Sequence, residues 1–216
     1  MKLISDGYEI IKDIFLDSEI ESMRNIAMSY FRNGNGFRNA GGIAKPDWIK
    51  DPFLQDIKFI IESKNFEKII EDRIGEPVKF ISHNDLHLNR SVGWHRDRLN
   101  NHYRRYEKYD PFEEINGQTM KIYKINIYLQ SHLKNNDCLE INLNSHISER
   151  IGNQNKIVHP DVGDIVVFDQ RMLHRATFSG GYDRLLICMG YGVENVFFEP
   201  FREGTMARQN DQNNNN

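Results

Sequence analysis

The chain has 216 residues, of which 39% are hydrophobic and 27% are charged, and its formal net charge is −3 at pH 7. This length suits one substantial core and is short for two, so we expect a single soluble globular domain. The small net charge, without a long Lys/Arg block, argues against a nucleic-acid partner. No segment approaches the ~20 apolar residues that span a bilayer, and the N-terminus lacks a signal-peptide stretch, so we expect a cytoplasmic protein with no membrane partner.

Helices are predicted in the first third of the chain. Apolar residues recur at helical spacing from about 18 to 32, and a Gly/Asn-rich loop follows over 33–42. A second helical region runs from Asp51-Pro52 to Gly75. These helices carry no recognisable chemistry, so we expect them to pack against the core.

Short β-rich runs dominate the rest of the chain, with turn signals between them. The predicted strands cover 8–16, 78–89, 121–130, 138–143, 155–158, 164–168, 174–178, 184–192 and 195–201. Many short strands at this spacing indicate a sandwich or jelly roll. The two cysteines, Cys138 and Cys188, fall in apolar runs and are expected to be reduced core thiols.

Two segments depart from this pattern. Residues 98–118 are polar, charged and aromatic and interrupt the strands, so they are predicted either to act as a lid or to form a solvated surface loop. Residues 204–216 form an Asn-rich tail that we expect to be disordered. The predicted single domain therefore covers 1–203.

A metal site is predicted from three residues. His95 and Asp97 form an H-x-D pair, and side chains two apart on a strand share a face. His174 lies far downstream, on a strand that can pack beside the first. Two histidines and one carboxylate cover one face of an octahedral metal and leave the opposite positions free, which is typical of non-haem Fe(II) oxygenases.

A carboxylate-binding site is predicted ten residues after His174. The guanidinium of Arg184 presents a planar fork of donors that suits the far carboxylate of a dicarboxylic cosubstrate. Thr177, three residues beyond His174, adds a hydroxyl for the same carboxylate.

Further cosubstrate contacts are predicted from polar residues on two strands. Polar side chains that face a barrel interior are costly unless they bind a ligand or water. The candidates are His87, Asn89, Asn126 and Tyr128.

The order of these residues resembles that of the Fe(II)/2-oxoglutarate-dependent oxygenases, and more narrowly of the phytanoyl-CoA dioxygenase-like family. Residues 7–17 are similar to the family's opening strand and first helix, and 125–130 with 137–146 are similar to its later strand-turn-strand stretch. The sequence departs from the pattern at 142–144, where Asn-Leu-Asn replaces apolar-Pro-Gly, and at Asn136-Asp137, which replaces Asn-Gly. The resemblance covers roughly residues 7–193.

The resemblance implies a fold that is mainly β with N-terminal helices, built on a double-stranded β-helix (jelly-roll, cupin-like) core. It implies that His95, Asp97 and His174 bind Fe(II) and that Arg184 holds 2-oxoglutarate. With O2, such an enzyme hydroxylates a C–H bond of a small-molecule substrate and releases succinate and CO2.

Two alternatives remain at this stage. One is a metal-dependent cupin-type enzyme that does not use 2-oxoglutarate, and the other is a jelly-roll binding module without activity. A test of cosubstrate dependence separates the first from the oxygenase, and iron binding separates the second. The substrate is not specified by the sequence, and a monomer and a homodimer are both compatible with it.

Overall fold

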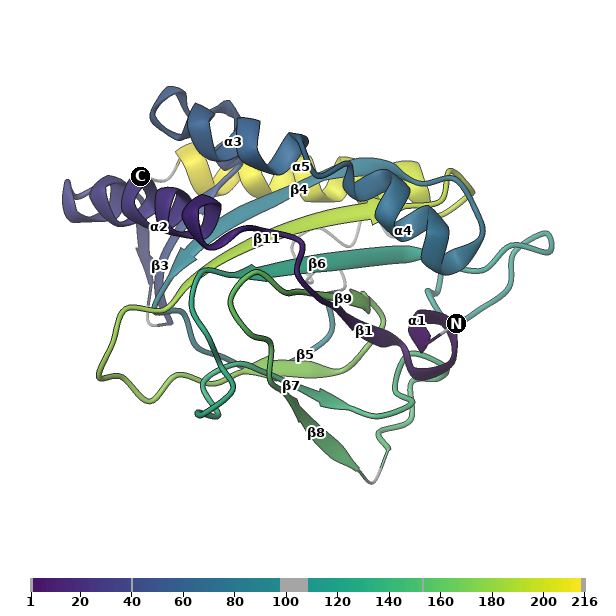
Figure 1. Ribbon diagram of the computed structural model, residues 1–216. Helices are drawn as coiled ribbons and strands as arrows, with labels where there is room; N and C mark the ends of the chain where they lie inside the picture. The colour runs from purple at the N-terminus through teal and green to yellow at the C-terminus, as the bar shows by residue number, and fades with distance from the viewer. Residues whose placement is uncertain (1, 40, 98–108, 153, 215–216) are drawn as a thin grey trace.

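A computed structural model of the protein describes residues 2–39, 41–97, 109–152 and 154–214. Two antiparallel β-sheets face each other, and helices cover the outer side of the larger sheet (Figure 1). This β-sandwich is the predicted jelly-roll core with its N-terminal helices.

The larger sheet has seven strands, each paired antiparallel with its neighbours. In spatial order these are β1 (Tyr8–Ile11), β9 (Ile165–Asp169), β6 (Ile122–Tyr128), β11 (Leu185–Gly192), β4 (Lys79–Leu88), β3 (Gly42–Pro46) and β2 (Phe37–Asn39). The smaller sheet contains β5 (Val92–His95), β10 (His174–Ala176), β7 (Leu139–Asn142) and β8 (Asn155–Val158).

Strand alternation divides the larger sheet into two faces. On β6, Ile125 and Ile127 belong to the core beneath the helices, whereas Tyr128 belongs to a second cluster between the sheets. Every residue of β6 is buried, because both of its faces are covered. The alternation of period two thus places apolar packing on one side and the space between the sheets on the other.

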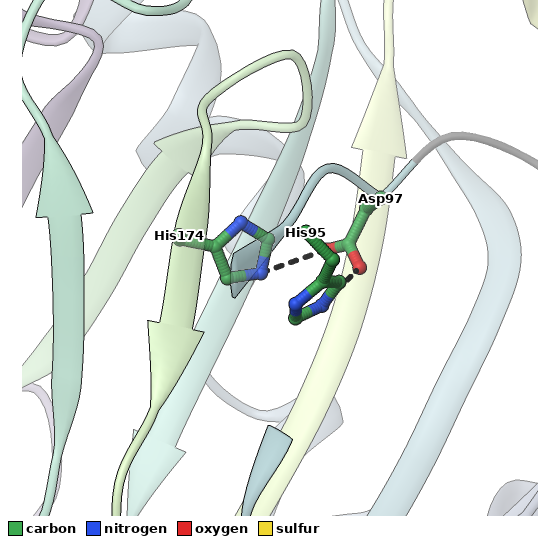
Figure 2. Close-up of side chains that lie close together, drawn as sticks. All are labelled: His95, Asp97 and His174. Atoms are coloured by element: carbon green, nitrogen blue, oxygen red, sulfur yellow. Dashed lines mark ion pairs between the residues drawn. The ribbon is translucent and has the colours of Figure 1, made fainter. Parts of the chain in front are cut away.

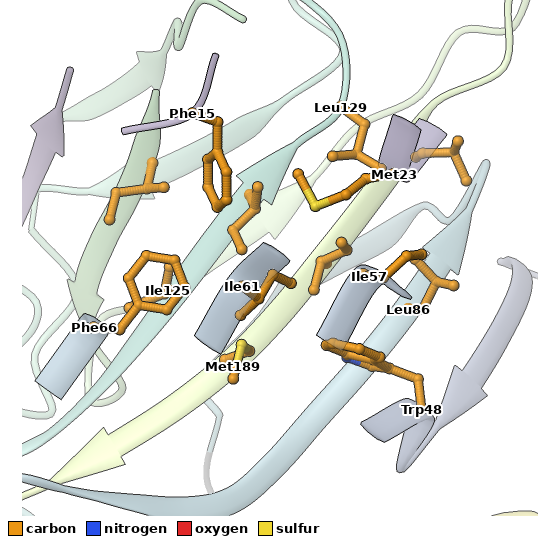
Figure 3. Close-up of a cluster of buried hydrophobic side chains, with 14 of the residues drawn as sticks. Phe15, Met23, Trp48, Ile57, Ile61, Phe66, Leu86, Ile125, Leu129 and Met189 are labelled. Carbon is orange, nitrogen blue, oxygen red and sulfur yellow. The ribbon is translucent and has the colours of Figure 1, made fainter. Parts of the chain in front are cut away.

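Helices α2 (Asp17–Arg32), α3 (Gln55–Glu62) and α4 (Phe66–Ile74) cover the outer face, and the short α1 (Lys2–Asp6) lies near the N-terminus (Figure 1). Figure 3 shows Met23, Ile61 and Phe66 from these helices gathered over Ile125 and Met189 of the sheet. Among the described residues, no helix has both the length and the apolar composition to cross a membrane.

The end of the chain differs from the prediction. Residues expected to form a strand at 195–201 and a disordered tail from 204 instead lead into α5 (Phe198–Asn214). This helix is polar in composition, but two of its residues bond to β4. The Gln209 amide donates to the Asn84 carbonyl at 3.1 Å, and Arg208 binds both carboxylate oxygens of Asp85 at 3.0 and 3.1 Å. Tertiary contacts therefore stabilise a segment whose own propensity is weak.

The Gly/Asn-rich loop predicted at 33–42 includes the edge strand β2 and ends at the first residue of β3. Gly42 has φ +132°, and a Cβ there would lie 2.7 Å from the Arg90 Cα. Only glycine allows β3 to run this close to the end of β4.

The predicted lid falls largely outside the described residues, since 98–108 are among those not described. Its later part packs on the body of the protein, with the Phe112 ring 4.9 Å from the Arg96 guanidinium carbon and the Tyr109 ring 5.7 Å from that of Phe197. A lid function for 98–118 stays a prediction.

Candidate metal and cosubstrate site

His95, Asp97 and His174 converge at one edge of the smaller sheet. His95 ends β5 and His174 begins β10, and the antiparallel register sets the two histidines opposite each other. The carboxylate oxygens of Asp97 lie 3.5 Å from His95 Nε2 and 3.6 Å from His174 Nε2 (Figure 2). One ligand atom from each of the three residues lies within 4.8 Å of the others. The predicted convergence is present, although Asp97 lies just beyond the strand rather than on it.

Main-chain carbonyl groups orient both imidazole rings. His95 Nδ1 lies 2.8 Å from the Gly93 oxygen, and His174 Nδ1 lies 2.9 Å from the Met172 oxygen. Because a carbonyl oxygen only accepts hydrogen bonds, each Nδ1 carries the proton and each Nε2 presents a lone pair toward Asp97. This arrangement is the usual support for a metal-binding histidine.

Burial and charge keep these groups in metal-binding protonation states. Burial raises the pKa of Asp97, but the charge of Lys124, whose Nζ lies 2.8 Å from Oδ2, outweighs it and holds that pKa well below its usual range. Burial lowers the pKa of His174 to about 3. Near neutral pH, Asp97 is therefore ionised and His174 is neutral.

The three side chains fit an octahedral divalent metal. Bonds of roughly 2.0–2.2 Å place neighbouring ligand atoms about 3 Å apart. Asp97 Oδ1 lies 3.5 Å from His95 Nε2 and Oδ2 lies 3.6 Å from His174 Nε2, so a shift of the carboxylate is needed to bring one oxygen close to both nitrogens. Lys124 is bound to Oδ2 of Asp97, which leaves Oδ1 for a metal. Hydrogen bonding of a ligating carboxylate from outside is common at metal sites.

Arg184 lies in the same cavity, which has a volume of about 330 Å³. The side chain is buried, at 2% exposure, and its guanidinium donates to the carbonyl groups of Asp137 at 3.0 Å, Thr177 at 2.7 Å and Arg90. Within the described part of the chain, no carboxylate lies within ion-pair distance of it, and its Nε has no hydrogen-bond partner. A buried cation without a counter-ion is costly, so this one is suited to an anionic ligand.

Two other predicted residues also have buried polar atoms that lack a hydrogen-bond partner within the described residues. Asn126 and Tyr128 line the cavity from β6, and Asn126 Oδ1 and the Tyr128 hydroxyl are buried without a partner among the described residues. Buried polar groups are normally satisfied. Together with Arg184 Nε, they fit a polar ligand bound between the sheets.

The side-chain geometry gives no support to two of the predicted cosubstrate contacts, those of Thr177 and Asn89. The Thr177 hydroxyl donates to the Asn136 carbonyl at 2.7 Å, so the backbone of Thr177 engages Arg184 and its hydroxyl does not face the cavity. Asn89 accepts from the Arg184 backbone N–H at 2.7 Å and donates to Asp183 at 3.2 Å. Both side chains satisfy neighbouring groups of their own chain and do not line the cavity.

His87, the remaining candidate, does line the cavity. Its Nε2 lies 2.8 Å from Nη1 of Arg90. Arginine only donates, so Nε2 is the acceptor and the imidazole is neutral. His87 thus contacts another basic residue of the wall.

Several cavity residues were missed from the sequence. They are His83, Asp85, Arg90, Lys124, Gln170 and Arg208. Alternation could have identified two of them, because Lys124 stands two residues before Asn126 and Asp85 two before His87. Arg208 gave no such signal, since it lies in the segment expected to be disordered.

No family model matches the sequence, and no curated protein matches it. Solved structures match the fold. HygX from Streptomyces hygroscopicus, with nickel and 2-oxoglutarate bound, aligns over 89% of this chain and 85% of its own, with a TM-score of 0.65 and 16% identity.

Two proteins of nogalamycin biosynthesis are also similar. The non-heme alpha ketoglutarate dependent carbocyclase SnoK aligns over 95% of this chain and 87% of its own, with a TM-score of 0.68 and 17% identity. The epimerase SnoN aligns over 89% and 78%, with a TM-score of 0.68 and 14% identity. The chain therefore has the jelly-roll fold of these non-haem, 2-oxoglutarate-binding proteins.

Proposed function

We propose that the protein is an Fe(II)- and 2-oxoglutarate-dependent dioxygenase that acts on a small-molecule substrate. One observation carries this proposal: the His95, Asp97 and His174 set shares a cavity with a buried Arg184 that has no carboxylate partner in the described ranges. The metal set alone suits many metalloenzymes, whereas a guanidinium with no carboxylate partner among the described residues adds a binding group for a dicarboxylate. HygX holds nickel and 2-oxoglutarate on the same fold, which supports the assignment.

Each residue has a defined task in this proposal. His95, Asp97 and His174 hold Fe(II) through two Nε2 atoms and one carboxylate oxygen. Arg184 pairs with the 5-carboxylate of 2-oxoglutarate, and Asn126 and Tyr128 supply the polar contacts that their unpartnered atoms require. When bound, iron and 2-oxoglutarate supply oxygen activation, coupled to release of succinate and CO2.

The surrounding residues orient and shield the site. The Nδ1 bonds to Gly93 and Met172 fix the imidazole rings, and Lys124 fixes the Asp97 carboxylate. Placement between two sheets limits access of water, and fixed dipoles are more effective in such a setting.

We propose hydroxylation of a C–H bond as the outcome. The fold accommodates other outcomes, because SnoN is an epimerase and SnoK a carbocyclase. Mass spectrometry of the product distinguishes them: hydroxylation adds one oxygen atom, epimerisation leaves the mass unchanged, and ring closure by oxidation removes two hydrogens.

Replacement of Arg184 tests the assignment of the cosubstrate. Loss of one partner from a buried charged pair costs roughly 3–5 kcal/mol, so Arg184→Ala should raise the 2-oxoglutarate concentration needed for succinate release at least about a hundredfold. Fe(II) affinity should be nearly unchanged. Arg184→Lys should recover part of the loss, because the charge remains without the planar fork.

The matched control is Arg175→Ala, on β10. Arg175 pairs with Glu140 at 2.6 Å and does not line the cavity, so its loss should leave the 2-oxoglutarate requirement unchanged. Unchanged affinity in Arg184→Ala would favour the cupin-type alternative. A folded wild-type protein that binds no Fe(II) would favour the binding module.

A further inference from the structure

Among the described residues that line the cavity, basic side chains outnumber acidic ones. One of these cations, Arg96, is bound to the main-chain carbonyl groups of Ser148 and Glu149. The remaining cations are Arg90, Lys124, Arg184 and Arg208, and the carboxylates are Asp85 and Asp97. Fe(II) and the 2-oxoglutarate dianion balance each other, so the excess of positive charge persists in the loaded enzyme.

Three of these four cations have an anion assigned to them. Lys124 lies 2.8 Å from the Asp97 carboxylate. Arg208 binds the Asp85 carboxylate at 3.0 Å from α5. Arg184 is assigned to the far carboxylate of 2-oxoglutarate.

Arg90 is the remaining cation. No carboxylate lies within ion-pair distance of its guanidinium among the residues the structure describes; Nη1 instead donates to the neutral His87 at 2.8 Å. This bond fixes one end of the guanidinium fork and leaves the other donors for a ligand. A partly buried, oriented guanidinium without a counter-ion is well suited to a carboxylate or phosphate group.

The cavity also contains polar groups that the cosubstrate assignment does not use. Gln170 is 1% exposed, and neither its amide oxygen nor its amide nitrogen has a hydrogen-bond partner within the described ranges. On α5, Thr205 and Gln212 add polar side chains to the wall. An unsatisfied buried amide costs about 1–3 kcal/mol, which a polar ligand would relieve.

We propose that the primary substrate is an organic anion whose carboxylate or phosphate group pairs with Arg90, with Gln170 hydrogen-bonding its polar remainder. This inference rests on the proposed function, because it presupposes that Arg184 is occupied by 2-oxoglutarate. It assigns Arg90 to substrate selection rather than to the metal or the cosubstrate.

Paired probes test the proposal on the loaded protein. Mn(II) replaces Fe(II) as a paramagnetic reporter, and 2-oxoglutarate is kept saturating so that Arg184 is occupied. The probe pairs are glycerol 3-phosphate against glycerol and 3-hydroxybutyrate against 1,3-butanediol, at constant ionic strength. Broadening of the probe's proton signals by Mn(II) reports binding near the metal.

At least one anion should bind about tenfold more tightly than its neutral partner, and the favoured pair identifies phosphate or carboxylate. Arg90→Gln should abolish the preference and Arg90→Lys should keep part of it. The control Arg202→Gln removes the same charge from α5 outside the cavity and should keep all of it.

Equal binding of charged and neutral probes, binding of neither, or a preference that survives Arg90→Gln would overturn the proposal. These results differ from a failure of the proposed function. A wild-type enzyme that releases succinate but shows no preference for anions contradicts only the inference, whereas one that consumes no 2-oxoglutarate contradicts the function itself.

Discussion

The two faces of the seven-stranded sheet use the same strands for opposite purposes. On β6, the outward Ile125 and Ile127 are fully buried and belong to the core that α2, α3 and α4 cover. Figure 3 shows Ile125 in this cluster. The inward Lys124, Asn126 and Tyr128 are also buried, yet Asn126 and Tyr128 carry polar atoms that have no hydrogen-bond partner among the residues described. The outer face is therefore fully packed by apolar side chains, and the inner face has hydrogen-bonding atoms available to a ligand.

On this strand, the outward residues contribute to stability and the inward residues are the candidates for ligand binding. Apolar burial on the outer face stabilises the fold in any state of ligation. Unsatisfied polar groups on the inner face destabilise the ligand-free protein and are relieved on binding. Substitutions on the two faces should consequently have different effects.

The largest effect on stability is expected from Ile125→Ala on the outer face. Ile125 is 0% exposed, and removal of its side chain leaves a cavity that costs about 2–5 kcal/mol of unfolding free energy. Urea denaturation measures the loss, and the 2-oxoglutarate requirement should stay unchanged where the variant is folded. A shifted requirement at full stability would contradict the separation of the two faces.

A smaller effect is expected from pH, through histidines of the inner face. Burial lowers the pKa of His83 and of His87, so the unfolded chain takes up protons below about pH 6.5 that the folded protein does not. Stability should fall as pH falls from about 7 to 5, by about 1–3 kcal/mol in the metal-free protein. Burial acts in the same direction on His132 and His146.

Urea denaturation of the metal-free protein at the two pH values checks this expectation. His87→Gln removes one of the groups and should make the pH dependence shallower. The same unfolding free energy at pH 7 and pH 5 would show that these histidines are accessible to protons in the folded state.

The smallest effect on stability is expected from Tyr128→Phe. The hydroxyl has no hydrogen-bond partner within the described part of the chain, so its removal should change the unfolding free energy by less than about 1 kcal/mol. The 2-oxoglutarate requirement should rise about tenfold, because one hydrogen bond to the cosubstrate is lost. A large loss of stability with an unchanged requirement would make Tyr128 a core residue.

The sequence predicted features that depend on short-range periodicity. Alternation identified β6 and its inward Asn126 and Tyr128, and the H-x-D spacing identified His95 and Asp97. Turn signals also located the strand that follows Arg184. In each case the local pattern and the tertiary contacts favour the same structure.

The sequence did not predict features that depend on local side-chain hydrogen bonds or on contacts between distant parts of the chain. Asn89 and Thr177 lie just beyond strand ends, and their side chains bond to groups of their own chain. Asn89 also has φ +55°, a conformation that strand periodicity does not indicate. Arg208 and Gln209 form contacts with β4 more than 120 positions earlier in the chain, which no local pattern reveals.

The central claim is that one cavity holds Fe(II) and 2-oxoglutarate together, and oxygen-free absorption spectroscopy tests it most directly. Chelation of Fe(II) by 2-oxoglutarate produces a visible charge-transfer band without turnover or a known substrate. The wild-type protein should develop this band on addition of both components, and Asp97→Ala, which lacks the carboxylate ligand, should not. Wild-type protein that binds Fe(II) but shows no band at saturating 2-oxoglutarate would contradict the account.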